Sequence, residues 1–469
     1  MSSLRNSPCA PSQRRTNRGS AVITVLVLAA VTAVIASGFL FRSAQEAKLA
    51  GRSLLQAVAL NLTEAGVEEG LYAANTSGFT SANGWTLASG STTDYVKSIT
   101  SGFDFRQATG AIYVRVDQAT SLSPVVIAAA VVSVPQQPAL VKQIRVGGIK
   151  RRLWSNGVVS QGTLTFSGSA VIDSYDSSLG PYNSATNRSD QVTVASASTA
   201  LDPVVVGSNA SVYGYIATTG ADPVVGAGGR IYGATTPEGT NVDTSRIRHD
   251  FTSNFPDVTA PTGTAISLSA IDSNLTLPRV GDTAGANGRY LYTTPSMSIA
   301  GHDLVAILGP VDLIVTGDLS ISGSGSLSVG GVGSTNPSLN VYCPGSISMG
   351  GNGMVNLTSN AASSTIWGTA VSPATQTVSI TGSGSYTGTI YAPNGNVTLS
   401  GSGDTSGSVI GKSVTVGGNG KYHYDTKLAA VEATLDTSFR LSSWTELTGT
   451  PGGGSAFARD NRAPFNTLF

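Results

Sequence analysis

Charge, histidine and cysteine are all scarce in this chain of 469 residues. Only 12% of the residues are charged, and 27 basic residues balance 27 acidic ones. Without a basic excess, nucleic acid is not an expected partner. The three histidines have no ligand-like spacing, so a zinc site is not expected either. With so little charge, solubility must come from Ser, Thr, Asn and exposed backbone, as it often does in β-rich exported proteins.

Charge and proline are wholly missing from Ser20 to Phe41, a run of 22 mostly apolar residues. At about 1.5 Å per helical residue this run is long enough to cross the hydrocarbon core of a bilayer. The segment before it carries four arginines and no acid, which keeps that end in the cytoplasm. The sequence thus predicts a single pass through the inner membrane, with the rest of the chain exported. Cys9 and Cys343 would then lie on opposite sides, so no internal disulfide is expected.

The apolar run continues into a longer helical pattern. Small and apolar residues recur in steps of three and four along one helix face, at Ala47, Gly51, Leu54, Leu55, Val58, Leu62 and Ala65. We expect one helix over 20–77, with 20–41 in the membrane. A secretory signal peptide would have a shorter apolar region and a cleavage site of small residues. An ordinary anchor that is never cut remains the alternative.

This N-terminus resembles those of type IV pilins and pseudopilins, in which a basic leader ends in glycine. The resemblance implies a cytoplasmic leader over 1–19, cut by a prepilin peptidase between Gly19 and Ser20. The segment 62–68 (LTEAGVE) looks like the corresponding part of PilX-type minor pilins and K-type pseudopilins. The fifth residue after the cut would be Thr24, where major pilins carry Glu. The resemblance therefore implies a minor subunit, placed at a fibre tip or in the assembly platform, with other pilins or pseudopilins as partners.

Two β-rich regions are expected after the helix. Residues 78–150 predict a small pilin-like α+β unit with strands at 111–116, 124–134 and 141–146, forming an antiparallel sheet. From 155 to 425 short apolar strands alternate with glycine. Five segments share the pattern apolar, small, Gly, Ser or Asn, Gly, and they begin at Ile321, Met349, Ile380, Leu399 and Val416. An earlier pair recurs near a period of 20: Asp202-Pro-Val-Val with Asp222-Pro-Val-Val, and Val212-Tyr-Gly with Ile231-Tyr-Gly.

Such a period indicates a stacked solenoid. We predict a parallel β-helix over 155–425, with one interior ladder through Ile380, Leu399 and Val416. A β-sandwich is the alternative. A loop insertion near 236–300, a cap over 426–449 and a flexible tail over 450–469 complete the prediction. The segment 391–425 resembles the C-terminal domain of an uncharacterised bacterial family that often follows a PilX-type N-terminus, and 172–176 fits the same resemblance.

No catalytic, cofactor-binding or metal-binding constellation stands out. From Gly301 to Gly420 the charged residues are few and scattered: Asp303, Asp312, Asp318, Asp404 and Lys412. His423 and Asp425 form a His–Asp pair in the sequence without a nucleophile signature, which favours a structural histidine. The leading hypothesis is a non-enzymatic pilin-like subunit that displays a β-helix for adhesion, with surface glycans as a candidate partner. The alternative is a membrane-anchored carbohydrate-active enzyme.

Overall fold

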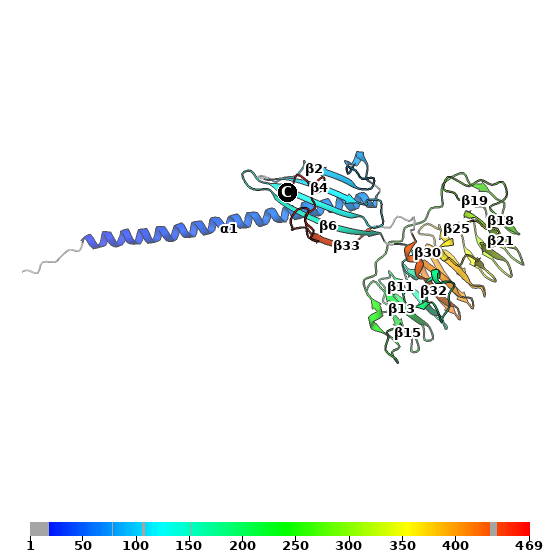
Figure 1. Ribbon diagram of the computed structural model, residues 1–469. Coiled ribbons are helices and arrows are strands. Elements are labelled where there is room, and N and C mark those ends of the chain that lie inside the picture. The colour runs from blue at the N-terminus through cyan, green and yellow to red at the C-terminus, as the bar shows by residue number, and fades with distance from the viewer. Residues whose placement is uncertain (1–17, 77, 106–107, 151, 432–438) are drawn as a thin grey trace, which may run out of the picture. The chain divides into compact units, whose positions relative to one another are not determined.

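The computed structural model describes residues 18–76, 78–105, 108–150, 152–431 and 439–469. The chain folds into two compact units (Figure 1). The first unit combines residues 1–149 with 439–469, and the second unit consists of residues 150–438. The second unit is therefore an insertion within the chain of the first unit.

The first unit is built on α1 (Arg18–Asn75), a single helix of 58 residues. The predicted long N-terminal helix is confirmed, but it begins at Arg18 rather than at 20 and ends at Asn75 rather than at 77. It ends where the Gly78 N–H donates to the carbonyl oxygen of Ala73, at 2.8 Å. Up to Leu54 the described side chains of α1 are almost all exposed, whereas its last five turns lie against a sheet.

An antiparallel sheet forms the body of the first unit, in the order β1-β2-β4-β5-β6-β33, with β3 beside β4. The strands have these bounds: β1 (Thr86–Leu87), β2 (Tyr95–Ile99), β3 (Asp104–Phe105), β4 (Ala108–Asp117), β5 (Val125–Ser133), β6 (Leu140–Lys150) and β33 (Phe439–Glu446), with the short helix η1 (Ser81–Asn83) before β1. The three strands predicted from sequence are the centre of this sheet, as β4, β5 and β6. The predicted antiparallel sheet is confirmed.

The helix and the sheet approach closely because α1 presents small residues to the strands. A Cβ at Gly66 would lie 2.7 Å from Cγ2 of Ile112, and a Cβ at Gly70 would lie 2.6 Å from Cγ1 of Val126. Ala59 and Ala73 are buried on the same side of the helix. Glycine in a helix interior costs about 1 kcal/mol relative to alanine, so these positions exchange helix propensity for close packing.

Two predictions for the C-terminal residues are wrong. The segment expected within a cap over 426–449 returns to the first unit as β33, because the edge strand β6 offers unpaired backbone groups. The tail expected to be flexible over 450–469 packs on the face of the sheet opposite α1. Phe465 and Leu447 are buried there against Ile127 and Ala129. A large aromatic side chain this well covered holds its segment in place.

Hydrogen bonds and ion pairs reinforce the contact between tail and sheet. Gln143 of β6 donates from Nε2 to the Asp460 carbonyl at 3.1 Å and accepts from the Asp460 N–H at 2.8 Å. Arg462 pairs with Asp117 at 2.6 Å and with Asp460 at 2.5 Å. Burial raises the pKa of the Asp460 carboxyl, but the hydrogen bonds and charge of Arg462 lower that pKa more, and the net direction is downward.

The second unit is almost entirely β-structure. Its strands are β7 (Val158–Ser160), β8 (Leu164–Phe166), β9 (Val171–Tyr175), β10 (Arg188–Ser189), β11 (Val192–Ser196), β12 (Val204–Val206), β13 (Ser211–Ala217), β14 (Val224–Val225), β15 (Arg230–Tyr232), β16 (Ile247–Arg248), β17 (Ile266–Ser267), β18 (Leu275–Leu277), β19 (Tyr290–Thr294), β20 (Met297–Ile299), β21 (Leu304–Ile307), β22 (Pro310–Val315), β23 (Leu319–Ile321), β24 (Ser326–Val329), β25 (Ser338–Cys343), β26 (Ile347–Met349), β27 (Met354–Asn356), β28 (Ser364–Gly368), β29 (Gln376–Ile380), β30 (Tyr386–Gly401), β31 (Thr405–Gly418) and β32 (Lys421–Asp425). Four short helices interrupt them: η2 (Ser177–Leu179), η3 (Thr244–Arg246), η4 (Ala361–Ser363) and η5 (Thr426–Ala430).

Parallel pairing dominates this unit, and the main sheet closes on itself, beside a four-stranded sheet β18-β21-β24-β27. The predicted interior ladder is confirmed strand by strand. Ile321 lies opposite Met349, Met349 opposite Ile380, Ile380 opposite Leu399, and Leu399 opposite Val416. Parallel pairing of this extent does not match the antiparallel sheets of the β-sandwich alternative.

The earlier repeat pair is half correct. Val212 lies opposite Ile231 as the sequence repeat predicts. In the Asp-Pro-Val-Val pair, however, Val205 rather than Val204 lies opposite Val224. Val204 and Val206 are fully buried, so the alternation of inward side chains sets the register and shifts it by one residue from the repeat.

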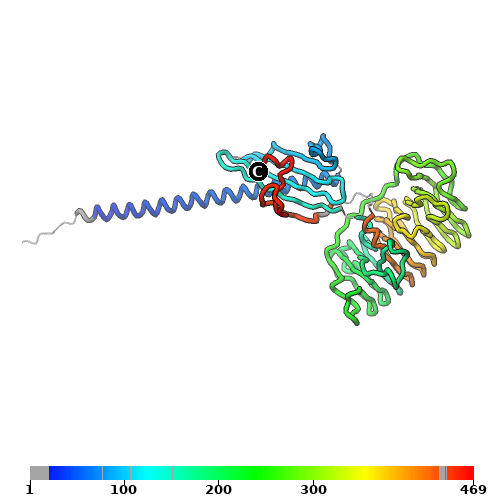
Figure 2. Tube along the Cα trace, viewed as in Figure 1, coloured from blue at the N-terminus to red at the C-terminus, as the bar shows by residue number. Residues whose placement is uncertain are grey.

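The order of the stacked strands differs from the order of the sequence. β31, near the end of this unit, pairs in parallel with β7 and β8 at its beginning, and β32 pairs with β9. The chain thus enters in the middle of the stack and builds outward to β16. It then restarts at the opposite end with β17 and builds back to the middle. Figure 2 shows the orange C-terminal strands between the green and the yellow ones.

The region expected as a loop insertion near 236–300 also contains elements of this stack: η3 and β16 lie at 244–248, and β17 to β20 lie between 266 and 299. Its longest segment without helix or strand, 249–265, connects the two ends of the stack. Phe251 and Val258 of the connection are buried, and the Pro256 carbonyl accepts a hydrogen bond from the Tyr391 hydroxyl at 2.9 Å. Proline has no backbone N–H to donate to a neighbouring strand, so the prolines of this segment fit a connection that lies outside the sheet.

Candidate functional site

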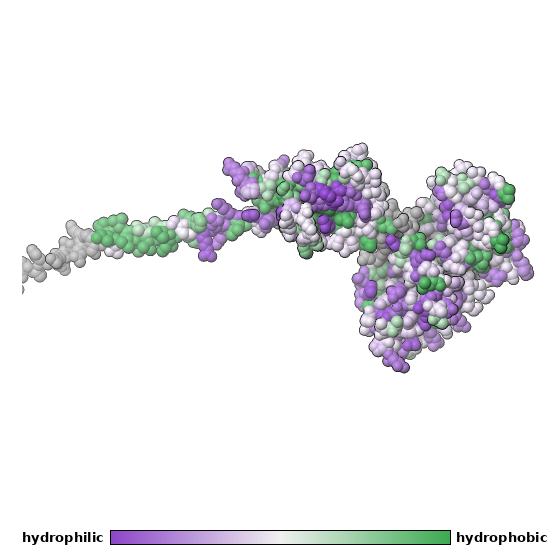
Figure 3. All heavy atoms as spheres, in the orientation of Figure 1, coloured by the Kyte–Doolittle hydropathy of each residue, from purple (hydrophilic) through white to green (hydrophobic). Residues whose placement is uncertain are grey.

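The apolar first half of α1 is the most conspicuous surface of the molecule. Within the described residues, α1 is the one helix long and apolar enough to cross a membrane, and none of its most apolar window is buried. Figure 3 shows this half as a green rod followed by a more polar stretch. Such a helix is compatible with a single-pass anchor or with a signal sequence. The first unit leaves it uncovered.

The predicted processing residues lie at the start of the same helix. Gly19 and Ser20 fall in the first turn of α1 by their backbone. Most of the leader, residues 1–17, lies outside the described residues. Cleavage between Gly19 and Ser20 stays a prediction.

A buried polar cluster in the second unit brings His423 to an aspartate that the sequence did not suggest. His423 of β32 lies directly opposite Asp173 of β9, and the His423 Nδ1 atom is 2.5 Å from the Asp173 Oδ1 atom. Oδ2 of Asp173 accepts from the Tyr182 hydroxyl and from Arg188 Nε, both at 2.8 Å. The Tyr182 ring stacks on the His423 ring with centroids 3.4 Å apart. Burial and the hydrogen bond to Asp173 raise the pKa of the Tyr182 hydroxyl.

The cluster lacks the access that a general base needs. His423 and Asp173 are each 1% exposed, and Tyr182 covers one face of the imidazole. No described residue makes a hydrogen bond to the Nε2 atom of His423, whose neighbouring acid, Asp404, is 3.7 Å away. A Ser–His–Asp arrangement would place a nucleophile there. The cluster instead joins β9, near the beginning of the second unit, to its last strand, β32.

Asp425, the histidine's neighbour in sequence, has a different role from the one that spacing suggested. Its Oδ1 atom accepts from the N–H groups of Ser177 and Lys427, both at 3.1 Å, and so begins η5. Sequence reasoning missed Asp173 because 250 residues separate it from His423. The resemblance that joined 172–176 to 391–425 was the available signal.

A second buried charge closes the far end of the stack. The Arg246 guanidinium is bound by Asp190 at 2.8 Å and lies 4.8 Å from the Tyr215 ring centre. A Cβ at Gly233 would lie 1.9 Å from Arg246 Cζ, so any side chain there would displace the guanidinium. Burial raises the pKa of Asp190, but a hydrogen bond from the Ala234 N–H and the Arg246 charge lower that pKa more. This arrangement anchors the end of the stack that finishes with β16.

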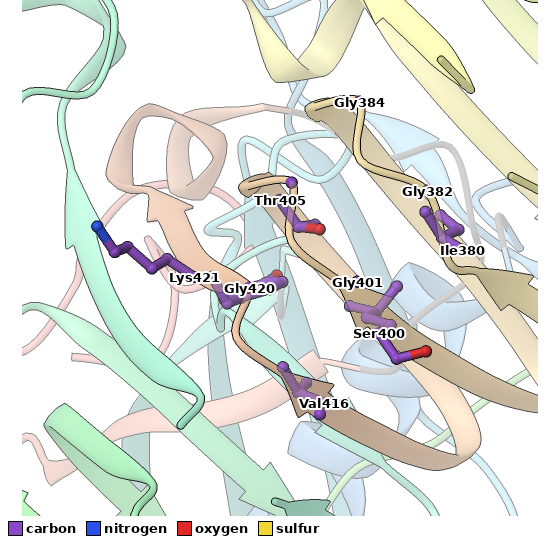
Figure 4. Close-up of a pocket in the computed structure, with 13 residues that line it drawn as sticks. Ile380, Gly382, Gly384, Ser400, Gly401, Thr405, Val416, Gly420 and Lys421 are labelled. Carbon is purple, nitrogen blue, oxygen red and sulfur yellow. The ribbon is translucent and has the colours of Figure 1, made fainter. Parts of the chain in front are cut away.

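The two units differ in the size of their cavities. The hollow drawn in Figure 4 lies at the glycine corners of the second unit and measures about 20 Å³, room for roughly one water molecule. Backbone fills this corner: a Cβ at Gly403 would lie 2.2 Å from the Gly384 carbonyl oxygen. A larger groove of about 570 Å³ lies in the first unit, between α1, the start of β6 and the tail, and Arg52, Lys142 and Arg459 line it.

The remaining predicted residues are dispersed. Asp312 accepts from Arg289 at 2.7 Å and from Asn340 at 2.8 Å, and Asp318 accepts from the Ser346 N–H at 2.7 Å. Within the part of the chain that the structure describes, no group of three or more His, Cys, Asp and Glu side chains could hold a metal ion.

Comparisons with known proteins match a family model and solved structures. A family model described as "Domain of unknown function (DUF7305)" matches residues 262–431. This span covers the strands from β17 to β32 and η5, which run from the β17 end of the stack back to its middle. It includes 391–425 but not 172–176. The match covers less than half of the chain.

One solved structure is similar over most of its length. It is the competence-associated pilin ComZ from Thermus thermophilus, with 11% identity over 83% of this chain and 96% of that chain, and a TM-score of 0.22. A score this low does not establish a shared fold, so the match has no weight for function. No curated protein matches.

Proposed function

We propose that this chain is a non-enzymatic, pilin-like subunit of the minor, PilX-like kind. A prepilin peptidase removes the leader between Gly19 and Ser20, the apolar half of α1 holds the subunit in the inner membrane, and the same half then packs against other pilin-type helices in a fibre or its assembly platform. The inserted second unit, a parallel β-helix in this proposal, is carried outside that membrane for adhesion to surfaces or glycans.

One observation carries the proposal: a single uninterrupted helix has a bare apolar half and a half packed on a sheet. The helix has no break between Phe41 and Leu55, so the apolar anchor continues directly into the half that packs on the sheet. Lipid gives no hydrophobic drive between helices, so association in the membrane depends on packing of small and apolar faces. In an aqueous fibre the same apolar surface has to be covered, at about 25 cal/mol for each Å² removed from water.

The chemistry of the second unit supports a display role. Its outward row beside the interior ladder is made of hydroxyl side chains in register, including Ser320, Ser348, Ser379 and Thr398. Such a surface is polar without charge, and it suits weak, repeated hydrogen bonding to a glycan or another surface. The unit begins and ends next to β6 and β33, two neighbouring strands of the first unit.

The test is the fate of the N-terminus and of the subunit. We expect N-terminal sequencing of the full-length protein from its native cells to begin at Ser20, and shear-released fibres to contain it. A Gly19→Leu variant should keep Met1 and stay in the membrane fraction, while Gly38→Leu, within the same apolar run, should be processed normally. A chain that keeps Met1 in every fraction would refute the proposal.

The carbohydrate-active alternative has its own test. If Asp173, His423 or Asp404 served catalysis, changing them to Ala would abolish release of sugars from a polysaccharide panel. The proposal expects no release from either the unchanged protein or these variants.

A further inference from the structure

Four charged side chains of α1 beyond the apolar half form two pairs with the same spacing in the sequence. Lys48 and Glu64 are 16 residues apart, and so are Arg52 and Glu68. All four side chains are exposed. No described residue forms an ion pair with any of them, whereas Arg42 pairs with Glu46 at 3.2 Å and Glu69 with Lys97 at 2.7 Å.

The basic pair and the acidic pair point in opposite directions. Sixteen residues advance a helix by about 24 Å and turn it by about 160° beyond whole turns. Glu64 and Glu68 lie on the back of the helix, away from the side on which Gly66 and Gly70 meet the sheet. Lys48 and Arg52 lie on the sheet side of the helix, but before the sheet begins.

A groove adjoins the basic pair, and Lys48 and Arg52 together with this groove are called the basic site below. Arg52 lines the groove of about 570 Å³ together with Lys142, Glu446 and Arg459. Glu446 is already neutralised by an ion pair with Lys142. The Nε atom of Arg459 is buried and has no hydrogen-bond partner among the described residues. Two cations of the groove, on Arg52 and Arg459, thus remain without an acidic partner there.

We propose that this basic site receives the acidic back of α1 from a second copy of the chain, and this inference rests on the pilin-like function proposed above. The two helices run parallel with a stagger of 16 residues, about 24 Å. One copy, the outer copy, is displaced by this distance toward the folded end of the other, the inner copy. Lys48 of the outer copy then meets Glu64 of the inner copy, and Arg52 of the outer copy meets Glu68 of the inner copy. Both pairs form in one register, which a single charge pair could not fix.

The contact uses different faces of the two copies, so it does not close. In a joined pair the outer copy keeps a free acidic back and the inner copy a free basic site, so the helix of another subunit can still add on either side. The second copy is favoured over an unrelated partner because both halves of the contact lie on the same helix with matched spacing.

Disulfide trapping in cells tests the register directly. One copy carries Arg52→Cys and a differently tagged copy carries Glu68→Cys, both with Cys9→Ser. We expect a disulfide dimer after mild oxidation, because facing positions of packed helices fall within disulfide reach. The matched control pairs Arg52→Cys with Glu64→Cys and should give no dimer. Within one copy, positions 52 and 68 are too far apart to join.

Charge reversal gives an independent readout in the unmodified background. Lys48→Glu with Arg52→Glu should lower the fibre content of the protein roughly tenfold, since exposed ion pairs each contribute a factor of a few and reversal makes them repulsive. Glu64→Lys with Glu68→Lys should do the same. The fourfold reversal restores both pairs between copies and should restore assembly.

The outcomes separate this inference from the proposed function. A cut subunit that enters fibres but gives the 52–64 disulfide, or no dimer, overturns the inferred contact and leaves the pilin-like function standing. A chain that keeps its leader and never leaves the membrane overturns both.

Discussion

The close contact between α1 and its sheet gives a quantitative prediction for Gly66. Replacing Gly66 with Ala adds a Cβ that would lie 2.7 Å from Cγ2 of Ile112 and 3.0 Å from Cβ of Ala128. Neither atom can rotate away, because one belongs to a β-branched side chain and the other is fixed to the backbone. Overpacking of this kind costs about 1–3 kcal/mol. The gain in helix propensity is about 1 kcal/mol. The net expectation is a loss of about 0–2 kcal/mol.

Gly51 on the same helix is the matched control. A Cβ there meets nothing within 4 Å, so Gly51→Ala adds propensity without a clash. Hydrogen exchange on the full chain in detergent micelles measures both variants. Gly66→Ala should speed amide exchange in β4, β5 and the last turns of α1, by up to about 30-fold for 2 kcal/mol. Gly51→Ala should slow exchange in its own turn and leave the sheet unchanged. If Gly66→Ala slowed exchange as Gly51→Ala does, the helix would not lie on the sheet at this distance.

Four further predictions concern the second unit, the tail and the free thiol. Gly351→Ala and Gly333→Ala both force alanine to positive φ, at about 1–2 kcal/mol, but only Gly351 faces a carbonyl oxygen 1.8 Å away, so only its variant should lower the melting temperature of the second unit strongly. Asp173→Ala should destabilise that unit by about 3 kcal/mol, because it leaves buried His423 without its charged partner; an unchanged unfolding midpoint in denaturant would show that the His423–Asp173 contact does not stabilise the unit. The lowered pKa of Asp460 means that its contribution to tail packing is present above the ordinary value of 3.8 and is lost as pH falls through the lowered pKa. Exchange over 458–469 should therefore accelerate below about pH 4, and Arg462→Gln, which removes the charge that lowers this pKa, should weaken this pH dependence because the folded and unfolded pKa values then differ less. Burial raises the pKa of the Cys343 thiol to about 11, so a maleimide at pH 8 should label it only after unfolding; rapid labelling of the folded, processed chain would show that the coil around it opens.

The sequence determined much of the local structure because the relevant signals are local. Continuous apolar and small residues without proline specify one helix from Arg18 to Asn75. The recurring glycine corners specified which strand lies next to which between Ile321 and Val416, and that register is confirmed. The strands β4 and β6 followed from alternation, and β5 followed from its continuous apolar run.

The candidate sites were less accessible to such reasoning. The bare apolar helix could be read directly, whereas the processing residues Gly19 and Ser20 rest on resemblance only. The partner of His423 could not be found by spacing, since the adjacent Asp425 is the nearer acid in sequence but caps η5 instead. The charge pairs on α1 became meaningful only once the sheet showed which side of the helix was covered.

Only the tertiary structure decided where the ends of each run of strands go. Whether β7 starts the stack or enters its middle depends on which exposed edge it completes, and β31 supplies that edge across some 250 residues of sequence. The same holds for β33, which completes the edge of β6, and for the tail, which buries Phe465 on a sheet face that the helix leaves open. Alternation and turn chemistry act within a few residues, so they fix the strands. Unsatisfied edges and uncovered apolar faces act on whatever chain can reach them, so they fix the order in which the strands are assembled.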